Sequence, residues 1–137
     1  SEDFLSRVPP KSTGRDLFNP AWLEQHLRAF DKLSAVDVQA TLTEFTALAC
    51  AMDVSVHAAK AQRLIVCGGG ALNGHLMRRL SAHLPGMDVV SSEERGLPPL
   101  QVEAAAFAWL AFKALRRETA SRSASSSASK SCVAWLR

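Results

Sequence analysis

The sequence predicts an α/β fold, with a strand-helix-strand-helix order that is preceded by two helices. From residue 62 onward, two short apolar runs alternate with two segments of helical periodicity, and this order requires a right-handed crossover and a parallel sheet. The first run, Leu64–Cys67, is continuously apolar and rich in β-branched residues, as in strands that are buried on both faces. A length of 137 residues with 47% hydrophobic and 21% charged residues is typical of one globular domain.

The N-terminal stretch, residues 1–19, predicts an extended segment with a turn, because Pro9 and Pro10 disfavour a helix. Asn19 is then a candidate N-cap, followed by Pro20 at the first helical position. We therefore expect a short helix that runs from Pro20 to about Phe30.

A second, longer helix is expected to begin near Ser34. Ser34 and Asp37 have the spacing of a capping box, with Asp in place of the usual Glu. Apolar residues recur at three- and four-residue steps over about five turns, which predicts one buried stripe. Its members are Val38, Leu42, Phe45, Leu48, Ala49, Met52 and Val56.

The second half of the chain carries the predicted sheet. A helix with Leu72, Leu76 and Leu80 is expected after the glycines that follow Leu64–Cys67, and it ends near Pro85. The second strand is expected at residues 87–91. The last helix follows Pro99, and its predicted inner face comprises Val102, Ala105, Ala106, Trp109 and Leu110. Two strands are too few to cover these helices, so we expect strands from outside this sequence to complete the sheet.

The net charge of +3 is unevenly distributed. Residues 1–110 hold 10 Lys or Arg and 12 Asp or Glu, whereas residues 111–137 hold 6 and 1. The positive excess thus lies in a Ser/Ala-rich, low-complexity stretch, which predicts a disordered tail over residues 118–137 rather than a nucleic-acid arm. Residues 1–117 are expected to form one partial domain.

Other features narrow the function classes. No apolar run approaches the roughly 20 residues of a membrane helix, and the N-terminus carries no secretory signal. The cysteines, Cys50, Cys67 and Cys132, form neither a disulfide framework nor a metal knuckle, which favours a reducing cytoplasm.

The four histidines fit no ligand pattern, so no metal site is expected. The chain does not begin with Met, which is compatible with a piece of a longer protein.

The most distinctive local pattern is the glycine run Gly68-Gly69-Gly70, through which the predicted strand leads into the next predicted helix. Glycines there allow a ligand to approach the main chain, and a helix N-terminus favours phosphates. A tight turn without a ligand explains the pattern equally well. A dinucleotide fold is a third interpretation, with Glu93 or Glu94 as the ribose-binding acid, but its third glycine is replaced by Asn73.

Glu103 is the second candidate functional residue. It lies in the first turn of the last predicted helix, which is otherwise almost wholly apolar. A carboxylate in such surroundings is compatible with a polar ligand in a cleft. The alternative is a favourable interaction of the acid with the helix N-terminus, worth about 0.3–1 kcal/mol.

Four stretches of the chain, in order and at compact spacing, resemble the C-terminal part of a sugar kinase of the hexokinase–actin superfamily. More narrowly, they resemble the anhydro-N-acetylmuramic acid kinase family, and the resemblance covers about residues 3–115. The most specific stretch is Pro9-Pro10-Lys11-Ser12-Thr13-Gly14-Arg15-Asp16-Leu17-Phe18-Asn19. The others are residues 37–44, residues 66–80, and Val102-Glu103-Ala104 with Phe107-Ala108-Trp109-Leu110-Ala111.

The resemblance implies part of an actin-like (ribonuclease H-like) ATPase domain and ATP-dependent phosphorylation of 1,6-anhydro-N-acetylmuramic acid with Mg²⁺. The anhydro ring opens in the same reaction, giving N-acetylmuramate 6-phosphate for peptidoglycan recycling in the cytoplasm. Gly68, Gly69, Gly70 and Asn73 fall on the nucleotide-binding motif, and Glu103 on a position expected to face the sugar. A homodimer is compatible with the resemblance, whereas nucleic-acid and membrane partners are not expected.

The chain also departs from the family pattern. The N-terminal glycine-rich phosphate loop and the aspartate that acts as general base have no counterpart in it, so it holds no catalytic residue. We therefore expect this chain alone to be inactive. The alternative is a non-catalytic remnant or interaction protein from a truncated or split kinase gene. After about Arg117 the sequence also departs from the family's ending, for which a frameshift or a wrong gene boundary is a hypothesis.

Overall fold

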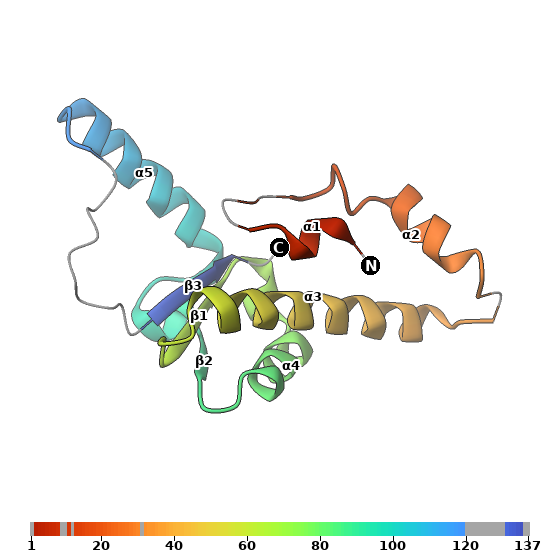
Figure 1. Cartoon of the computed structure of the whole chain (residues 1–137). Helices are drawn as coiled ribbons and strands as arrows, with labels where there is room; N and C mark the ends of the chain where they lie inside the picture. The colour runs from red at the N-terminus through yellow and green to blue at the C-terminus, as the bar shows by residue number, and fades with distance from the viewer. Residues whose placement is uncertain (1, 9–10, 12, 31, 120–130, 136–137) are drawn as a thin grey trace. The chain divides into compact units, whose positions relative to one another are not determined.

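Three strands form one parallel sheet in the computed structural model, which describes residues 2–8, 11, 13–30, 32–119 and 131–135. The strands are β1 (Arg63–Cys67), β2 (Asp88–Ser91) and β3 (Ser131–Trp135), in the order β2-β1-β3 (Figure 1). Both neighbours run parallel to β1, and Ile65 lies opposite Val90 on one side and Val133 on the other. The predicted α/β fold with a parallel sheet is thus confirmed.

β3 is a strand that the sequence interpretation does not include. Residues 131–135 lie within the predicted tail, and they pair along β1 over its whole length. The thiol of Cys67 donates a hydrogen bond to the carbonyl oxygen of Ala134 at 3.3 Å. A disordered tail is therefore wrong for these five residues, because the short apolar run that ends the chain completes the second edge of β1. Residues 120–130 lie outside the described part of the chain.

The core of the second of two compact units, Thr43–Arg137, lies between β1 and two helices. These helices are α3 (Ala35–His57) and α4 (Gly74–His83). Small residues of α3 and leucines of α4 share this core with residues of β1. The buried residues of this cluster are Ala47, Ala51, Leu64, Val66, Leu76, Leu80 and Leu84.

The expected cap of α3 at Ser34 is present, but the predicted buried stripe is wrong. Ser34 Oγ accepts from the Asp37 N–H at 3.1 Å and donates to Asp37 Oδ2 at 2.7 Å. The residues of α3 that are buried are Thr43, Ala47 and Ala51, whereas Leu48, Met52 and Val56 are exposed. Because α3 is apolar on more than one face, periodicity alone does not identify the face that meets β1.

The last helix, α5 (Val102–Leu115), follows a short 3₁₀ helix, η3 (Pro99–Gln101). No residue of α5 is buried, so its predicted inner face is wrong for this chain. Trp109 and Leu110 are exposed, and Figure 1 shows α5 extending away from the sheet. The reason is that no described element packs along its length.

The first unit, Ser1–Leu42, contains two short helices and the beginning of α3. α1 (Asp3–Ser6) lies where the sequence predicts extended chain, and α2 (Pro20–Leu27) ends before Phe30. The predicted N-cap is confirmed, because Asn19 Oδ1 accepts from the Trp22 N–H at 2.9 Å. The Trp22 indole N–H donates to Glu2 Oε1 at 2.8 Å, which fastens α1 to α2. None of the described helices combines the length and apolarity that a bilayer crossing requires.

Candidate functional site

The glycine turn, residues 68–73, leaves the carboxyl end of β1. Gly68 has φ 80° and ψ −173°, a conformation that is essentially restricted to glycine. Its N–H donates a hydrogen bond to the carbonyl oxygen of Pro99 at 3.0 Å. The turn therefore needs glycine at position 68 for its backbone geometry, and it is held against the segment that leads into α5.

Gly69 is the position in this turn with room for a ligand. It begins the 3₁₀ helix η1 (Gly69–Leu72), and the first N–H groups of a helix have no partner within it. Gly69 is exposed, and a Cβ atom built on it meets no atom within 4 Å. Gly70, in contrast, is buried. Of the predicted residues, Gly69 thus best suits close approach of a phosphate or another anionic group to the main chain.

Asn73 has a structural role that the sequence interpretation does not include. Its Oδ1 accepts hydrogen bonds from the N–H groups of His75 at 3.0 Å and Leu76 at 3.2 Å. Asn73 is therefore the N-cap of α4, and Leu72, expected in this helix, lies in η1 and is exposed. The cap fixes where the turn ends and α4 begins.

Ser92 is a residue at the same edge of the sheet that the sequence interpretation misses. Val66 pairs with Ser91, so Ser92 follows the carboxyl end of β2 beside the glycine turn. Ser92 is 5% exposed, and its Oγ has no hydrogen-bond partner in the described part of the chain. Ligands of parallel sheets bind outside the carboxyl ends of the strands, and this rule could have identified it. Glu93 and Glu94, the acids of the dinucleotide interpretation, follow in η2 (Ser92–Arg95) and are exposed.

Glu103 lies in the first turn of α5 and is half-buried. Pro99, four residues earlier, is the residue whose carbonyl oxygen binds Gly68. The chain thus connects Glu103 to the glycine turn through a short segment that is itself tied to the turn. The role of Glu103 as a sugar ligand stays a prediction.

A charged cluster joins α3 to α4 on the side chains of Glu44, Arg79 and His83. Arg79 donates two hydrogen bonds to the Glu44 carboxylate, at 2.6 and 2.9 Å, and His83 Nε2 lies 2.7 Å from Glu44 Oε1. The bonds from Arg79 and then His83 lower the pKa of Glu44 from 4.5 to about 2. The cluster therefore holds α4, the helix that follows the glycine turn, against α3.

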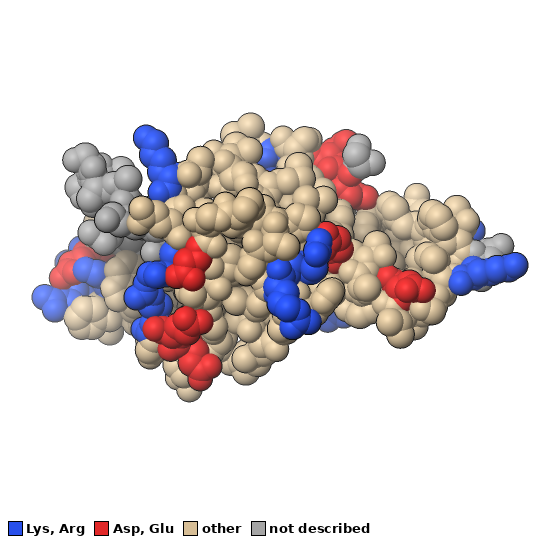
Figure 2. Space-filling view, turned by 90° about the horizontal axis from the view of Figure 1, so that it is seen from below, with Lys and Arg blue, Asp and Glu red and all other residues tan. Residues whose placement is uncertain are grey.

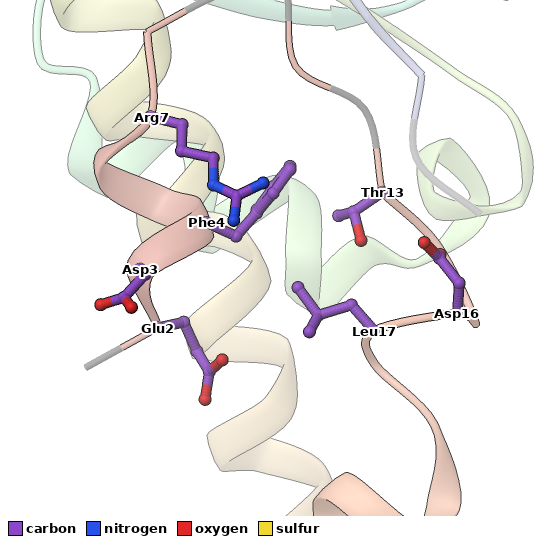
Figure 3. A pocket seen from close by; sticks show the side chains of 7 residues that line it. All are labelled: Glu2, Asp3, Phe4, Arg7, Thr13, Asp16 and Leu17. Carbon is purple, nitrogen blue, oxygen red and sulfur yellow. The ribbon is translucent and has the colours of Figure 1, made fainter.

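A pocket of about 420 Å³ lies in the first unit (Figure 3). Thr13, from the stretch that most specifically resembles the family, contributes a buried hydroxyl without a hydrogen-bond partner among the described residues. Three carboxylates and a single guanidinium line the pocket, and this balance disfavours phosphates and other anions. The lining residues are Glu2, Asp3, Phe4, Arg7, Thr13, Asp16 and Leu17.

Charges of both signs are interspersed over the face shown in Figure 2, and most of that face is uncharged. Within the described ranges, no group of three or more His, Cys, Asp or Glu side chains could hold a metal ion. The features that favour a ligand are therefore the main chain at Gly69 and the buried hydroxyl of Ser92, both at the carboxyl edge of the sheet.

Comparisons with known proteins agree on one family. The family model described as "Anhydro-N-acetylmuramic acid kinase" matches residues 1–134. A protein of that name from Variovorax paradoxus (strain S110) is 61% identical over 118 residues, covering 86% of this chain and 32% of the relative. Its namesake from Albidiferax ferrireducens is 58% identical over 120 residues, covering 88% and 31%. A third, from Psychrobacter arcticus, is 46% identical over 138 residues, covering 95% and 32%. The chain spans about a third of the length of these relatives.

Proposed function

This chain belongs to the anhydro-N-acetylmuramic acid kinase family, and we propose on that basis that it is one part of an ATP-dependent amino-sugar kinase. The reaction transfers the γ-phosphoryl group of ATP to O6 of 1,6-anhydro-N-acetylmuramic acid. Water adds to the anomeric carbon, the bond between that carbon and O6 breaks, and ADP and N-acetylmuramate 6-phosphate leave. The product enters peptidoglycan recycling, and the proposed location is the cytoplasm.

The observation that carries this proposal is the glycine turn at the carboxyl edge of a parallel sheet. Gly68 supplies the backbone geometry, Gly69 leaves the main chain open, and Asn73 fixes the start of α4. Gly68, Gly69, Gly70 and Asn73 are thus assigned to the nucleotide, in an actin-like domain. When bound, ATP supplies the phosphoryl group, and Mg²⁺ neutralises the negative charge of the phosphates. Phosphoryl transfer depends mostly on such positioning, which is the contribution of this chain.

Glu103 is assigned to the sugar. Its carboxylate is suited to accept hydrogen bonds from sugar hydroxyls, and it lies in the segment that follows Pro99. Because the chain spans about a third of its relatives, the general base and the phosphate loop are assigned to the remainder of a family protein. We accordingly propose that the isolated chain has no kinase activity.

The second candidate is a non-catalytic remnant or interaction protein. In this second candidate the chain, which spans about a third of the relatives, acts without the remainder of a family protein. The two candidates differ in whether the glycine turn and Glu103 are still able to serve a complete kinase. A homodimer is compatible with both.

A chimera separates the candidates. In this chimera, the matched segment of the Variovorax paradoxus relative is replaced by this chain, and the unaltered relative is the control. We expect ATP-dependent phosphorylation of 1,6-anhydro-N-acetylmuramic acid, followed by ADP release and by mass spectrometry of the product. A folded chimera without turnover, beside an active control, would favour the remnant.

A further inference from the structure

α5 is a helix whose apolar side chains are exposed along its length. Nine consecutive residues, 104–112, carry no charge. In a helix that packs only within this chain, such residues would be covered, yet none of α5 is buried. Its exposed large apolar side chains are Phe107 (64%), Trp109 (45%), Leu110 (43%), Phe112 (50%) and Leu115 (86%).

These side chains point in every direction around the helix axis. With 3.6 residues per turn, Leu115, Phe112, Trp109 and Leu110 lie at roughly 80°, 140°, 200° and 300° from Phe107. A helix that is apolar all round is one that a larger protein or a membrane encloses. The 14 residues of α5 span about 21 Å, less than the roughly 30 Å of a bilayer core, which leaves enclosure by protein.

Charged groups gather at the C-terminal end of α5. Lys113 Nζ lies 2.6 Å from Glu118 Oε2 and 5.7 Å from the centroid of the Trp109 ring. Arg116 Nε lies 2.8 Å from Glu118 Oε1, and its guanidinium carbon lies 5.1 Å from the Phe112 ring centroid. This end of the helix is thus suited to solvent, and the apolar surface is the part before Lys113.

We propose that the apolar surface of α5, defined as residues 104–112, is the docking element around which the remainder of a family kinase packs. The occupant follows from length, because about two-thirds of each matched relative has no counterpart in this chain. The proposal rests on family membership and does not depend on the chemistry assigned to Gly69 or Glu103.

A second copy of this chain is a poorer occupant. A two-fold contact places the same patch of both copies face to face, so it covers one side of a helix. The exposed apolar residues of α5 are spread around the whole circumference, and a two-fold contact would leave several of them in water. Enclosure requires a partner with more surface than one helix face, and the remaining two-thirds of a family protein has it.

The test compares this chain alone with the chimera described above, by hydrogen exchange read by mass spectrometry. We expect the amides of residues 104–112 to exchange at least tenfold more slowly in the chimera. The double variant Phe107→Gln/Leu110→Gln should leave the melting temperature of this chain nearly unchanged, because both side chains are already exposed. The same variant should lower the melting temperature of the chimera by several degrees. The control is Val56→Gln, an apolar position on α3 that is 72% exposed.

Several results would overturn the proposal. Equal exchange rates of residues 104–112 in this chain and in the chimera would contradict it. Equal changes in the melting temperature of the chimera for the α5 and Val56 variants would contradict it as well. Failure of the chimera to fold beside a folded parent would count against it as well. Concentration-dependent self-association of this chain, lost in the double variant, would assign the surface to a second copy. A chimera in which α5 is protected from exchange but which has no kinase turnover would support the docking surface and contradict the proposed function. A chimera with kinase turnover but an unprotected α5 would support the proposed function and contradict the docking surface.

Discussion

The N–H of Gly68 donates a hydrogen bond to the carbonyl oxygen of Pro99 at 3.0 Å. This bond joins two segments that are about thirty residues apart, the glycine turn after β1 and the approach to α5. Pro99 is buried, so the bond is shielded from water. The candidate nucleotide position and the candidate sugar ligand, Glu103, are therefore connected through one main-chain contact.

Replacing Gly68 by alanine should destabilise the chain. The conformation at Gly68, with φ 80° and ψ −173°, costs other residues about 1–3 kcal/mol. Urea unfolding followed by circular dichroism would measure the loss. The matched control is Gly74→Ala, where a Cβ meets only the end of the Arg78 side chain, at 3.5 Å. Equal stability of the two variants would contradict the backbone role of Gly68.

The Glu44 cluster should make stability depend on pH in the acid range. The pKa of Glu44 is lowered to about 2 by Arg79 and His83, so its contribution is complete above pH 4.5 and is lost as pH falls toward 2. The variant Glu44→Gln should melt at a lower temperature than the unaltered chain at pH 6. At pH 2, where about half of Glu44 is protonated in the folded chain, this gap should be much smaller. A gap of the same size at pH 2 and pH 6 would show that the carboxylate charge is not its cause, and Glu94→Gln, at an exposed acid, is the control.

Local signals predict several elements of this chain correctly. The caps at Asn19 and Ser34 and the strands β1 and β2 each depend on a few neighbouring residues, and the structure has all of them. In the candidate site, the glycines and Asn73 are local features as well. The sequence predicts this strand-to-helix turn because its glycines determine the backbone geometry, whereas its assignment to a nucleotide stays a prediction.

The remaining features depend on residues that are distant in the sequence. Which face of α3 is buried is decided by β1 and α4, and the strand character of residues 131–135 is decided by the open edge of β1. Ser92 becomes a candidate only after β2 is placed beside β1. α5 is predicted to have an inner face because its sequence suits burial, yet no element among the described residues buries it.

Cys67 should react with iodoacetamide far more slowly than Cys50. Burial raises the pKa of the Cys67 thiol, and its side chain is inaccessible, whereas Cys50 is half-buried. The Cys67 thiol also donates to Ala134 of β3, so its protection depends on β3 remaining paired. Peptide mass spectrometry after timed labelling would measure both rates. Comparable rates in the folded chain would show that β3 does not cover Cys67, and labelling in urea gives the unprotected reference.

The glycine turn and Glu103 should affect different substrates of the chimera. At Gly69 a Cβ meets no atom within 4 Å, so Gly69→Val should fold and its side chain should occupy the space assigned to the nucleotide. We expect the KM for ATP to rise tenfold or more, about 1.4 kcal/mol, and the KM for the anhydro-sugar to change much less. Glu103→Gln should show the opposite pattern, with a raised KM for the anhydro-sugar and a nearly unchanged KM for ATP.

Circular dichroism of each variant establishes that it is folded before its kinetics are compared. Gly74→Ala is again the matched control, since it adds a methyl group one residue beyond the turn without reaching its open side. A folded Gly69→Val chimera with an unchanged KM for ATP would make the turn purely structural. Equal effects of Glu103→Gln on both substrates would instead assign that carboxylate to the N-terminus of α5, where an acid is stabilised by the helix dipole. The two variants therefore test the nucleotide and sugar assignments separately, because each predicts a change in one KM and constancy in the other.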